Sequence, residues 1–520
     1  MESARPSSSL AKPENDSSEG GADREGAALA QLGIEEVAKR DIGMFTIACT
    51  AWNITNAWAA IATTIALVLS SGGTVTMLYG IIVIFVLGGS SAASMAELAS
   101  VYPTTGGQYH WTSILAPERF NRAWSYFCGA ANIFSWITVS ASVAIIVPQL
   151  VLGMAIFYNP SYQAETWHYF MLYQAASLVC TVYNIFLMKR TAWVQDIGFC
   201  LSISSFLVIL VTSLARSTHK QSAEFVWTTF FNNTGWTSDG IVFLTGLVSP
   251  NYIYAGIDGA IHLAEECCNA SVAVPRALLA TVGIGFLTGF SFAVTMAYTM
   301  SDFDAVVNTP TGVPVYEIWH QATRSPAAAT TFISLLLFAV VLSLNGCIQT
   351  ASRLTWSFAR DDALVFSSSI RRMDPRLHVP VWALIANYAV VFVIGCVYLG
   401  SSTAFNAIVG TGLVLQQTTF VVPIVLLMYR GRGAQWLPPS RAFSLGRVFG
   451  WVVNVTTVVF GVVVVVFYNF PVVMPVEAGN MNYTSAVLGC MGVFAVLNWV
   501  FYARRRYTGP RIVSTTAATT

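Results

Sequence analysis

The sequence predicts an all-α polytopic membrane protein with twelve transmembrane helices. Of its 520 residues, 55% are hydrophobic and only 10% are charged, whereas soluble domains carry roughly 25% charged residues. Apolar runs long enough to cross a bilayer, which takes about 20 residues per helix, recur along the chain. The basic residues gather in every second connection, a distribution typical of proteins that span membranes.

Each predicted span is an apolar run bounded by polar segments that hold nearly all of the charge. The first five runs lie at 43–69, 77–99, 124–157, 170–187 and 194–214. The next five lie at 241–262, 277–300, 327–348, 381–399 and 405–428, and two more lie at 448–468 and 486–502.

The same pattern divides the chain into four parts. Residues 1–40 are expected to form a disordered cytosolic tail, because they offer few large apolar groups to offset the entropy of ordering. No apolar run precedes Asp41, so the first span is expected to act as the targeting signal. A ten-helix core over 41–428, two additional transmembrane helices within 429–503 and a cytosolic tail over 504–520 follow.

The basic residues support the number of spans independently. With the amino terminus inside, all but three of the 26 Lys and Arg residues fall on the inner side, and the exceptions are Arg216, Lys220 and Arg324. Lys and Arg accumulate in cytoplasmic loops, and one span more or fewer would scatter this asymmetry. We therefore expect an even number of spans and both termini in the cytosol.

Polar residues interrupt the first span near its middle. The stretch holds two amides and two hydroxyls, and we assign substrate binding to Trp52, Asn53, Thr55, Asn56 and Trp58. Backbone groups freed from a helix cannot face lipid, since each would cost several kcal/mol, so they must line a cavity or be packed inside protein. The alternative is a polar helix face buried against neighbouring helices.

The sixth span carries a second interruption. Pro250 removes a backbone donor, and the glycines Gly256 and Gly259 weaken the continuity of the helix. We assign Tyr254, Gly256 and Asp258 to the same substrate site, because an acid at mid-depth costs about 2.5–3.5 kcal/mol on insertion scales and usually has a function. An ordinary proline kink is the alternative.

Two interrupted spans that lie five helices apart indicate a mechanism. The arrangement is typical of transporters built from a five-plus-five inverted repeat, in which half-helix ends and free carbonyl groups bind substrate and ions. The pattern therefore favours a secondary transporter that works by alternating access.

Other polar residues are candidates for the same site or for coupling. Asn345 and Gln349 share a helix face and either line the cavity or link helices. Asp258, Glu97 and His262 are the candidates for proton coupling, with a loop-capping role for Glu97 and a packing role for His262 as alternatives. Two Asn-x-Thr sequons lie in predicted outer loops, which makes Asn232 and Asn482 candidate glycosylation sites.

Three segments resemble one family. They are the fifteen residues from Glu97 to Trp111 after the second span, the segment from Ala264 to Arg276 after the sixth, and Arg353–Ala363 after the eighth. All three resemble loops of the amino acid, polyamine and organocation superfamily, and the run from Asn53 to Trp58 resembles its fungal amino acid/choline transporter branch. In the second segment, Glu265 and Glu266 are expected to pair with basic residues such as Arg276.

The resemblance covers roughly residues 38–506 and has consequences for fold and activity. It implies the five-plus-five fold with two added spans, and secondary transport that is commonly proton-coupled in fungi. It also implies a small amine or amino acid as substrate, such as choline or gamma-aminobutyrate. An aromatic face of Trp58 or Tyr254 could meet a quaternary ammonium through a cation–π contact, and Asp258 could pair with the cation or carry the coupled proton.

Other classes of function are disfavoured. The sequence shows no metal cluster, cofactor loop or paired catalytic residues, so no enzyme, cofactor or metal is expected, and no nucleic-acid partner. A nutrient sensor that binds without translocating is the main alternative. The expected partners are a small-molecule substrate, the lipid bilayer and a coupled proton, and the plasma membrane is preferred over a vacuolar or other endomembrane address.

Overall fold

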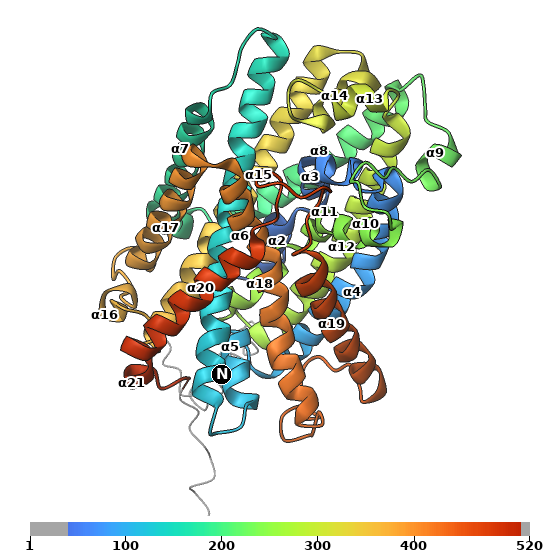
Figure 1. Ribbon diagram of the computed structural model, residues 1–520. Helices are drawn as coiled ribbons and strands as arrows, with labels where there is room; N and C mark the ends of the chain where they lie inside the picture. Colours follow the sequence, from blue (N-terminus) through green and yellow to red (C-terminus); the bar gives the residue numbers. More distant parts are fainter. Residues whose placement is uncertain (1–39, 511–520) are drawn as a thin grey trace, which may run out of the picture.

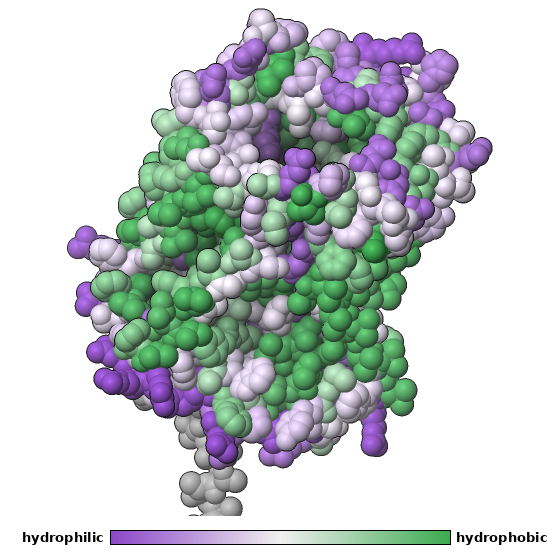
Figure 2. Space-filling model, in the orientation of Figure 1, coloured by the Kyte–Doolittle hydropathy of each residue, from purple (hydrophilic) through white to green (hydrophobic). Residues whose placement is uncertain are grey.

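The computed structural model describes residues 40–510 (Figure 1). Twelve helical segments within this part of the chain are long and apolar enough to cross a membrane, which is the predicted number. Of the predicted tails over 1–40 and 504–520, residues 1–39 and 511–520 lie outside the described residues. Figure 2 shows an apolar band across the middle of one face of the molecule and polar residues at both ends, which is the surface that a bilayer requires.

Ten of the spans are continuous helices. They are α4 (Gly73–Val101), α6 (Asn121–Tyr158), α7 (Thr166–Phe186), α8 (Trp193–Arg216), α12 (Ala270–Thr299), α15 (Pro326–Arg360), α17 (Val381–Gly400), α18 (Ser402–Tyr429), α19 (Val448–Phe467) and α20 (Thr484–Asn498), which continues through the π-helical turn η4 (Trp499–Ala503) into α21 (Arg504–Arg506).

Short helices fill the connections between these spans. They are α5 (Gln108–Leu115), η1 (Met188–Arg190), α9 (Ala223–Trp227), α13 (Phe303–Val307), α14 (Pro314–Thr323) and α16 (Ser367–Ile370). We call the end of the bundle that holds α5 and α21 the terminal face, and the end that holds α14 the opposite face (Figure 1).

The first and sixth spans are broken, as predicted. The first consists of α2 (Met44–Thr55) and α3 (Ala57–Leu69), separated by Asn56. The sixth consists of four short pieces, α10 (Asp239–Gly246), α11 (Val248–Asn251), η2 (Tyr252–Tyr254) and η3 (Ile257–Glu266).

The broken spans lie inside the bundle. Of the 18 most apolar consecutive residues in each span, 78% are buried within the protein in the first span and 61% in the sixth, compared with 11% in the twelfth. The helices around them pack in two groups, α4 against α12 and α6 against both α15 and α18. The polar backbone of the breaks is therefore kept away from lipid.

The eighth span is longer than predicted. We expected it to end near Ile348 and Arg353–Ala363 to form a loop, but α15 continues to Arg360. Arg353 and Arg360 form ion pairs with the end of η3, so the helix can carry both charges beyond the apolar region. The sequence pattern alone did not reveal these partners.

Candidate functional site

The break in the first span is a single residue. Asn56 has a left-handed conformation with φ 36° and ψ 65°, which Asn adopts more readily than most residues. Its side-chain oxygen accepts a hydrogen bond from Ser202 at 3.1 Å, and Ser202 in turn accepts one from Trp58 at 3.0 Å. These contacts fix the amide, whose buried Nδ2 atom has no partner within the described chain.

The break in the sixth span is longer. Ala255 is extended and Gly256 has φ 78°, so the helix stops after Tyr254 and restarts at Ile257. A Cβ atom on Gly256 would lie 2.7 Å from the side chain of Ile54, which shows how closely the two breaks approach each other. The amide nitrogen of Gly256 donates to Gln416 on α18 at 3.2 Å instead of to its own helix.

A cavity of about 270 Å³ lies beside the two breaks. It is lined by residues of α2, α3, α6, η2, α15 and α18, and none of them is an acid, a Lys, an Arg or a His. Its polar groups include Thr55, Asn56, Thr63, Gln149, Tyr252, Ser343 and Asn406. Sites of 300 to 1,000 Å³ hold drug-sized ligands, so this one has the size for a small metabolite.

The cavity is reached from the opposite face. Leu67, Gln149 and Asn406 line its outer part and are exposed, whereas Asn56 and Cys347 at its inner end are only 2% and 1% exposed. Figure 2 shows the surface hollowed on this side of the molecule, below its upper rim. The described conformation is thus open toward one side of the bundle.

The predicted residues of the first span divide between two environments. Thr55 and Asn56 line the cavity. Trp52, Asn53 and Trp58 face α8 instead, where Trp52 packs on the ring of Phe199 and Asn53 donates to the backbone and side chain of Gln195, both at 2.8 Å. The contacts of these three residues therefore fit the alternative interpretation, in which a polar helix face is buried against a neighbouring helix.

Three other predicted residues also lie outside the cavity lining. Tyr254 donates to the carbonyl of Val282 on α12, and Tyr252 is the aromatic residue that η2 places at the cavity. Asn345 accepts from Asn184 at 2.7 Å and links α15 to α7. Gln349 is buried one turn further along α15.

Asp258 lies at the centre of a buried polar cluster on the terminal side of the breaks. Its side chain is fully buried and accepts hydrogen bonds from Gln108 at 2.8 Å, Gln416 at 3.0 Å and Trp136 at 3.3 Å. Gln416 also holds the amide of Gly256, so one side chain links the acid to the break. These donors come from α5, α18 and α6, and together they compensate the burial of the carboxyl group.

His262 completes this cluster. Its Nδ1 atom is 2.8 Å from the carbonyl oxygen of Thr105, which can only accept, so Nδ1 carries hydrogen. Its Nε2 atom is 3.1 Å from Asp258. A hydrogen bond between them needs one more proton, either on the imidazole or on the carboxyl group. Nε2 also lies 3.5 Å from the side-chain nitrogen of Asn132 on α6.

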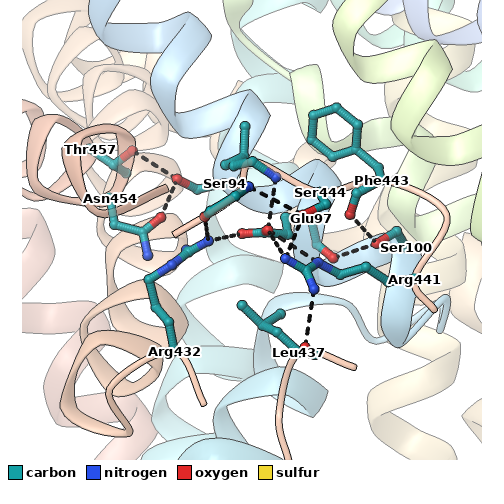
Figure 3. A network of polar contacts seen from close by, with 12 residues as sticks. Ser94, Glu97, Ser100, Arg432, Leu437, Arg441, Phe443, Ser444, Asn454 and Thr457 are labelled. Atoms are coloured by element: carbon teal, nitrogen blue, oxygen red, sulfur yellow. Dashed lines mark hydrogen bonds and ion pairs between the residues drawn. The ribbon is translucent and has the colours of Figure 1, made fainter. Parts of the chain in front are cut away.

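Glu97 lies at the terminal face and outside the cavity lining, and Figure 3 shows its polar contacts. Its buried carboxylate forms ion pairs with Arg432 and with Arg441, the latter at 3.0 Å. It also accepts from the backbone amide of Leu445 at 3.0 Å. The residue thus anchors the connection between α18 and α19 to the end of α4.

Further ion pairs close the terminal face below η3. Glu265 pairs with Arg360 at 2.7 Å, and Glu266 pairs with Arg353 at 2.9 Å and with Lys189. Lys189 also reaches Asp41 before the first span, at 3.1 Å. Both glutamates thus pair with basic residues, as predicted. Arg276 is not among these partners, because it lies on α12, whereas α15 brings Arg353 and Arg360 to the carboxylates.

The two sequons lie toward the opposite face, in the connections beside α9 and α20. Asn232 donates to the carbonyl of Trp236 and to Asp239, and Asn482 donates to the carbonyls of Tyr468 and Phe470. Both side chains are half-buried. Glycosylation of either residue would require these hydrogen bonds to break.

Several residues of the site were not predicted from the sequence. Gln108, Trp136 and Gln416 bind Asp258, and Tyr252 and Ser343 line the cavity. The sequence did contain a signal for such residues, namely amide side chains inside apolar runs, at Asn132 in the third run and Gln416 in the tenth. Polar groups in membrane helices usually face a partner.

Comparison with known proteins agrees with this architecture. A family model described as amino acid permease matches residues 42–496. The chain is 32% identical over 470 residues to a choline transporter of Saccharomyces cerevisiae, covering 90% of this chain and 82% of that protein. It is 27% identical over 500 residues to an amino-acid permease of Arabidopsis thaliana, covering 93% and 95%.

A third relative, a swainsonine transporter of Arthroderma benhamiae, is 29% identical over 447 residues and covers 84% of this chain and 85% of its own. The match of the family model extends from the start of the first span into the twelfth. With its twelve spans and two broken helices, the chain therefore belongs to the amino acid permease family of membrane transporters.

Proposed function

We propose that the chain is a secondary transporter that carries a small amine, such as choline or gamma-aminobutyrate, across the plasma membrane by alternating access. The observation that carries this proposal is the uncharged cavity of about 270 Å³ at the meeting point of two broken helices. The terminal face is taken to be cytosolic, because the basic residues gather there. The described conformation then faces outward.

The cavity suits a molecule with an ammonium group and an oxygen acceptor. The carboxyl-terminal ends of α2 and η2 meet there, and helix ends of this kind carry partial negative charge. Tyr252 can add a cation–π contact worth about 0.5–2 kcal/mol. The unpaired Nδ2 atom of Asn56 would donate to a hydroxyl or carboxylate oxygen.

Proton coupling is assigned to the pair of Asp258 and His262. Loss of their shared proton would leave two acceptors facing each other at 3.1 Å, and the change would reach the break of the sixth span through Gln416. A proton that crosses the membrane down a gradient of one pH unit releases about 1.4 kcal/mol of free energy. This amount supports roughly tenfold accumulation of substrate.

The test is uptake into proteoliposomes, with and without a pH gradient. A panel of labelled choline, gamma-aminobutyrate, ethanolamine, polyamines and neutral amino acids identifies the substrate. We expect accumulation driven by the gradient for one class of amine. Binding without accumulation would contradict the proposal and favour the nutrient sensor.

The coupling is tested by Asp258→Asn. This variant keeps the shape of the side chain but removes the shared proton, so substrate should equilibrate without gradient-driven accumulation. Asp304→Asn, at an exposed position on α13, is the matched control. Unchanged accumulation in Asp258→Asn would show that the proton is carried elsewhere.

A further inference from the structure

The connection between α18 and α19 concentrates positive charge at the terminal face. Four arginines lie between Tyr429 and Tyr468, at positions 430, 432, 441 and 447, and this segment contains no acid. Arg430 is occupied, because its guanidinium donates to the carbonyls of Leu115 and Ala116. The other three surround a common space.

That space is a hollow of about 360 Å³. Arg432, Arg441 and Arg447 line it, together with backbone of Gly431 and Gly446. It is separate from the substrate cavity, with which it shares no lining residue.

The charges around the hollow are not balanced. Glu97 is the carboxylate that pairs with Arg432 and Arg441 (Figure 3). Arg447 is exposed and forms no ion pair with the part of the chain that the structure describes. Three guanidinium groups thus face a single carboxylate, which leaves an excess of two positive charges at the hollow. This excess attracts an added anion.

The surroundings of the hollow indicate what kind of anion fits. Large apolar side chains beside it point away from the protein, with Tyr429 72%, Val448 78% and Phe449 61% exposed. Val452 continues this surface one turn along α19, at 57% exposed. The hollow thus lies at the end of a lipid-facing helix surface, where a ligand with acyl chains can place its charged group.

From this geometry we propose that the hollow binds the phosphate group of an anionic phospholipid. The guanidinium group of Arg447 holds the phosphate, since arginine matches its geometry. Arg432 and Arg441 already donate to Glu97 and add positive charge to the wall. The acyl chains lie along α19. If the terminal face is cytosolic, as proposed above, the site lies in the leaflet that carries anionic lipids. The bound lipid would stabilise the connection between α18 and α19, which Glu97 anchors to the end of α4.

The test measures the unfolding temperature of the purified full-length protein in detergent, followed by tryptophan fluorescence during titration with phosphatidic acid, phosphatidylcholine or inorganic phosphate. We expect phosphatidic acid to raise the unfolding temperature at lower concentration than phosphatidylcholine. Arg447→Gln should weaken this effect about fivefold, the value of one basic residue near an anionic membrane surface. Arg447→Lys should retain most of it.

Arg505→Gln is the matched control, because Arg505 is exposed on α21 at the same face. The site would be refuted if Arg447→Gln and Arg505→Gln weakened stabilisation equally, or if both lipids stabilised the protein alike. Stabilisation by inorganic phosphate with the same dependence on Arg447 would refute the lipid and identify a free anion. Uptake is not the readout, so these outcomes are independent of the transported substrate.

Discussion

At the scale of single residues, the two helix breaks lie at positions with unusual backbone conformations. Asn56 and Gly256 both have positive φ, and each separates two helical pieces of a broken span. Asn56 can adopt this conformation because it is an Asn, and Gly256 because it has no Cβ. The sequence pattern identified both as members of the breaks.

Replacement of Gly256 tests the close approach of the two breaks. Gly256→Ala would place a methyl group 2.7 Å from Ile54 and 3.2 Å from Trp136 at a φ that disfavours side chains, so we expect a strain of about 1–3 kcal/mol. The unfolding temperature and the uptake rate should both fall. Gly489→Ala on α20, where no atom lies within 4 Å, should change neither. Equal behaviour of the two variants would contradict the described packing.

The sequence predicted the positions of the breaks more accurately than the contacts of the side chains around them. Polar residues mark the first span, but only the folded helix shows that Asn53 and Trp58 face α8 while Thr55 and Asn56 face the cavity. The interruption shifts the helical period, so positions after Asn56 cannot be placed from the preceding turn. The partners of Asp258 were missed because Gln108 and Gln416 lie about 150 residues away in sequence.

At the scale of elements, ion pairs connect helices that are distant in the chain. Glu97 joins α4 to the connection between α18 and α19, and Glu265 and Glu266 join η3 to α15. The sequence predicted that charges gather at this face, because they cannot enter the bilayer. It could not predict which charges pair, since that depends on where each helix ends.

Glu97→Gln tests the connection at α4. Removal of this carboxylate leaves Arg432 and Arg441 without their acid, and breaking a buried ion pair costs about 3–5 kcal/mol. A lower unfolding temperature in tryptophan fluorescence is therefore expected. Glu118→Gln, at an exposed position, serves as control and should behave as the wild type. A wild-type unfolding temperature in Glu97→Gln would mean that the pairs contribute little.

At the scale of the whole molecule, the fold places three features in separate parts of the bundle. The cavity lies beside the breaks, the pair of Asp258 and His262 lies on their terminal side, and the ion pairs of η3 close the terminal face. Twelve spans and two breaks were predictable because the bilayer imposes length and apolarity on each helix. The position of the cavity was not, since six helical elements contribute to its wall.

The most direct test of the account is the position of the bound substrate. A structure of the purified protein, determined by cryo-electron microscopy with the amine that the uptake panel identifies, should show density between Asn56 and Tyr252. The ammonium group should lie toward the ends of α2 and η2. Substrate density elsewhere, with this cavity empty at saturating concentration, would contradict the account.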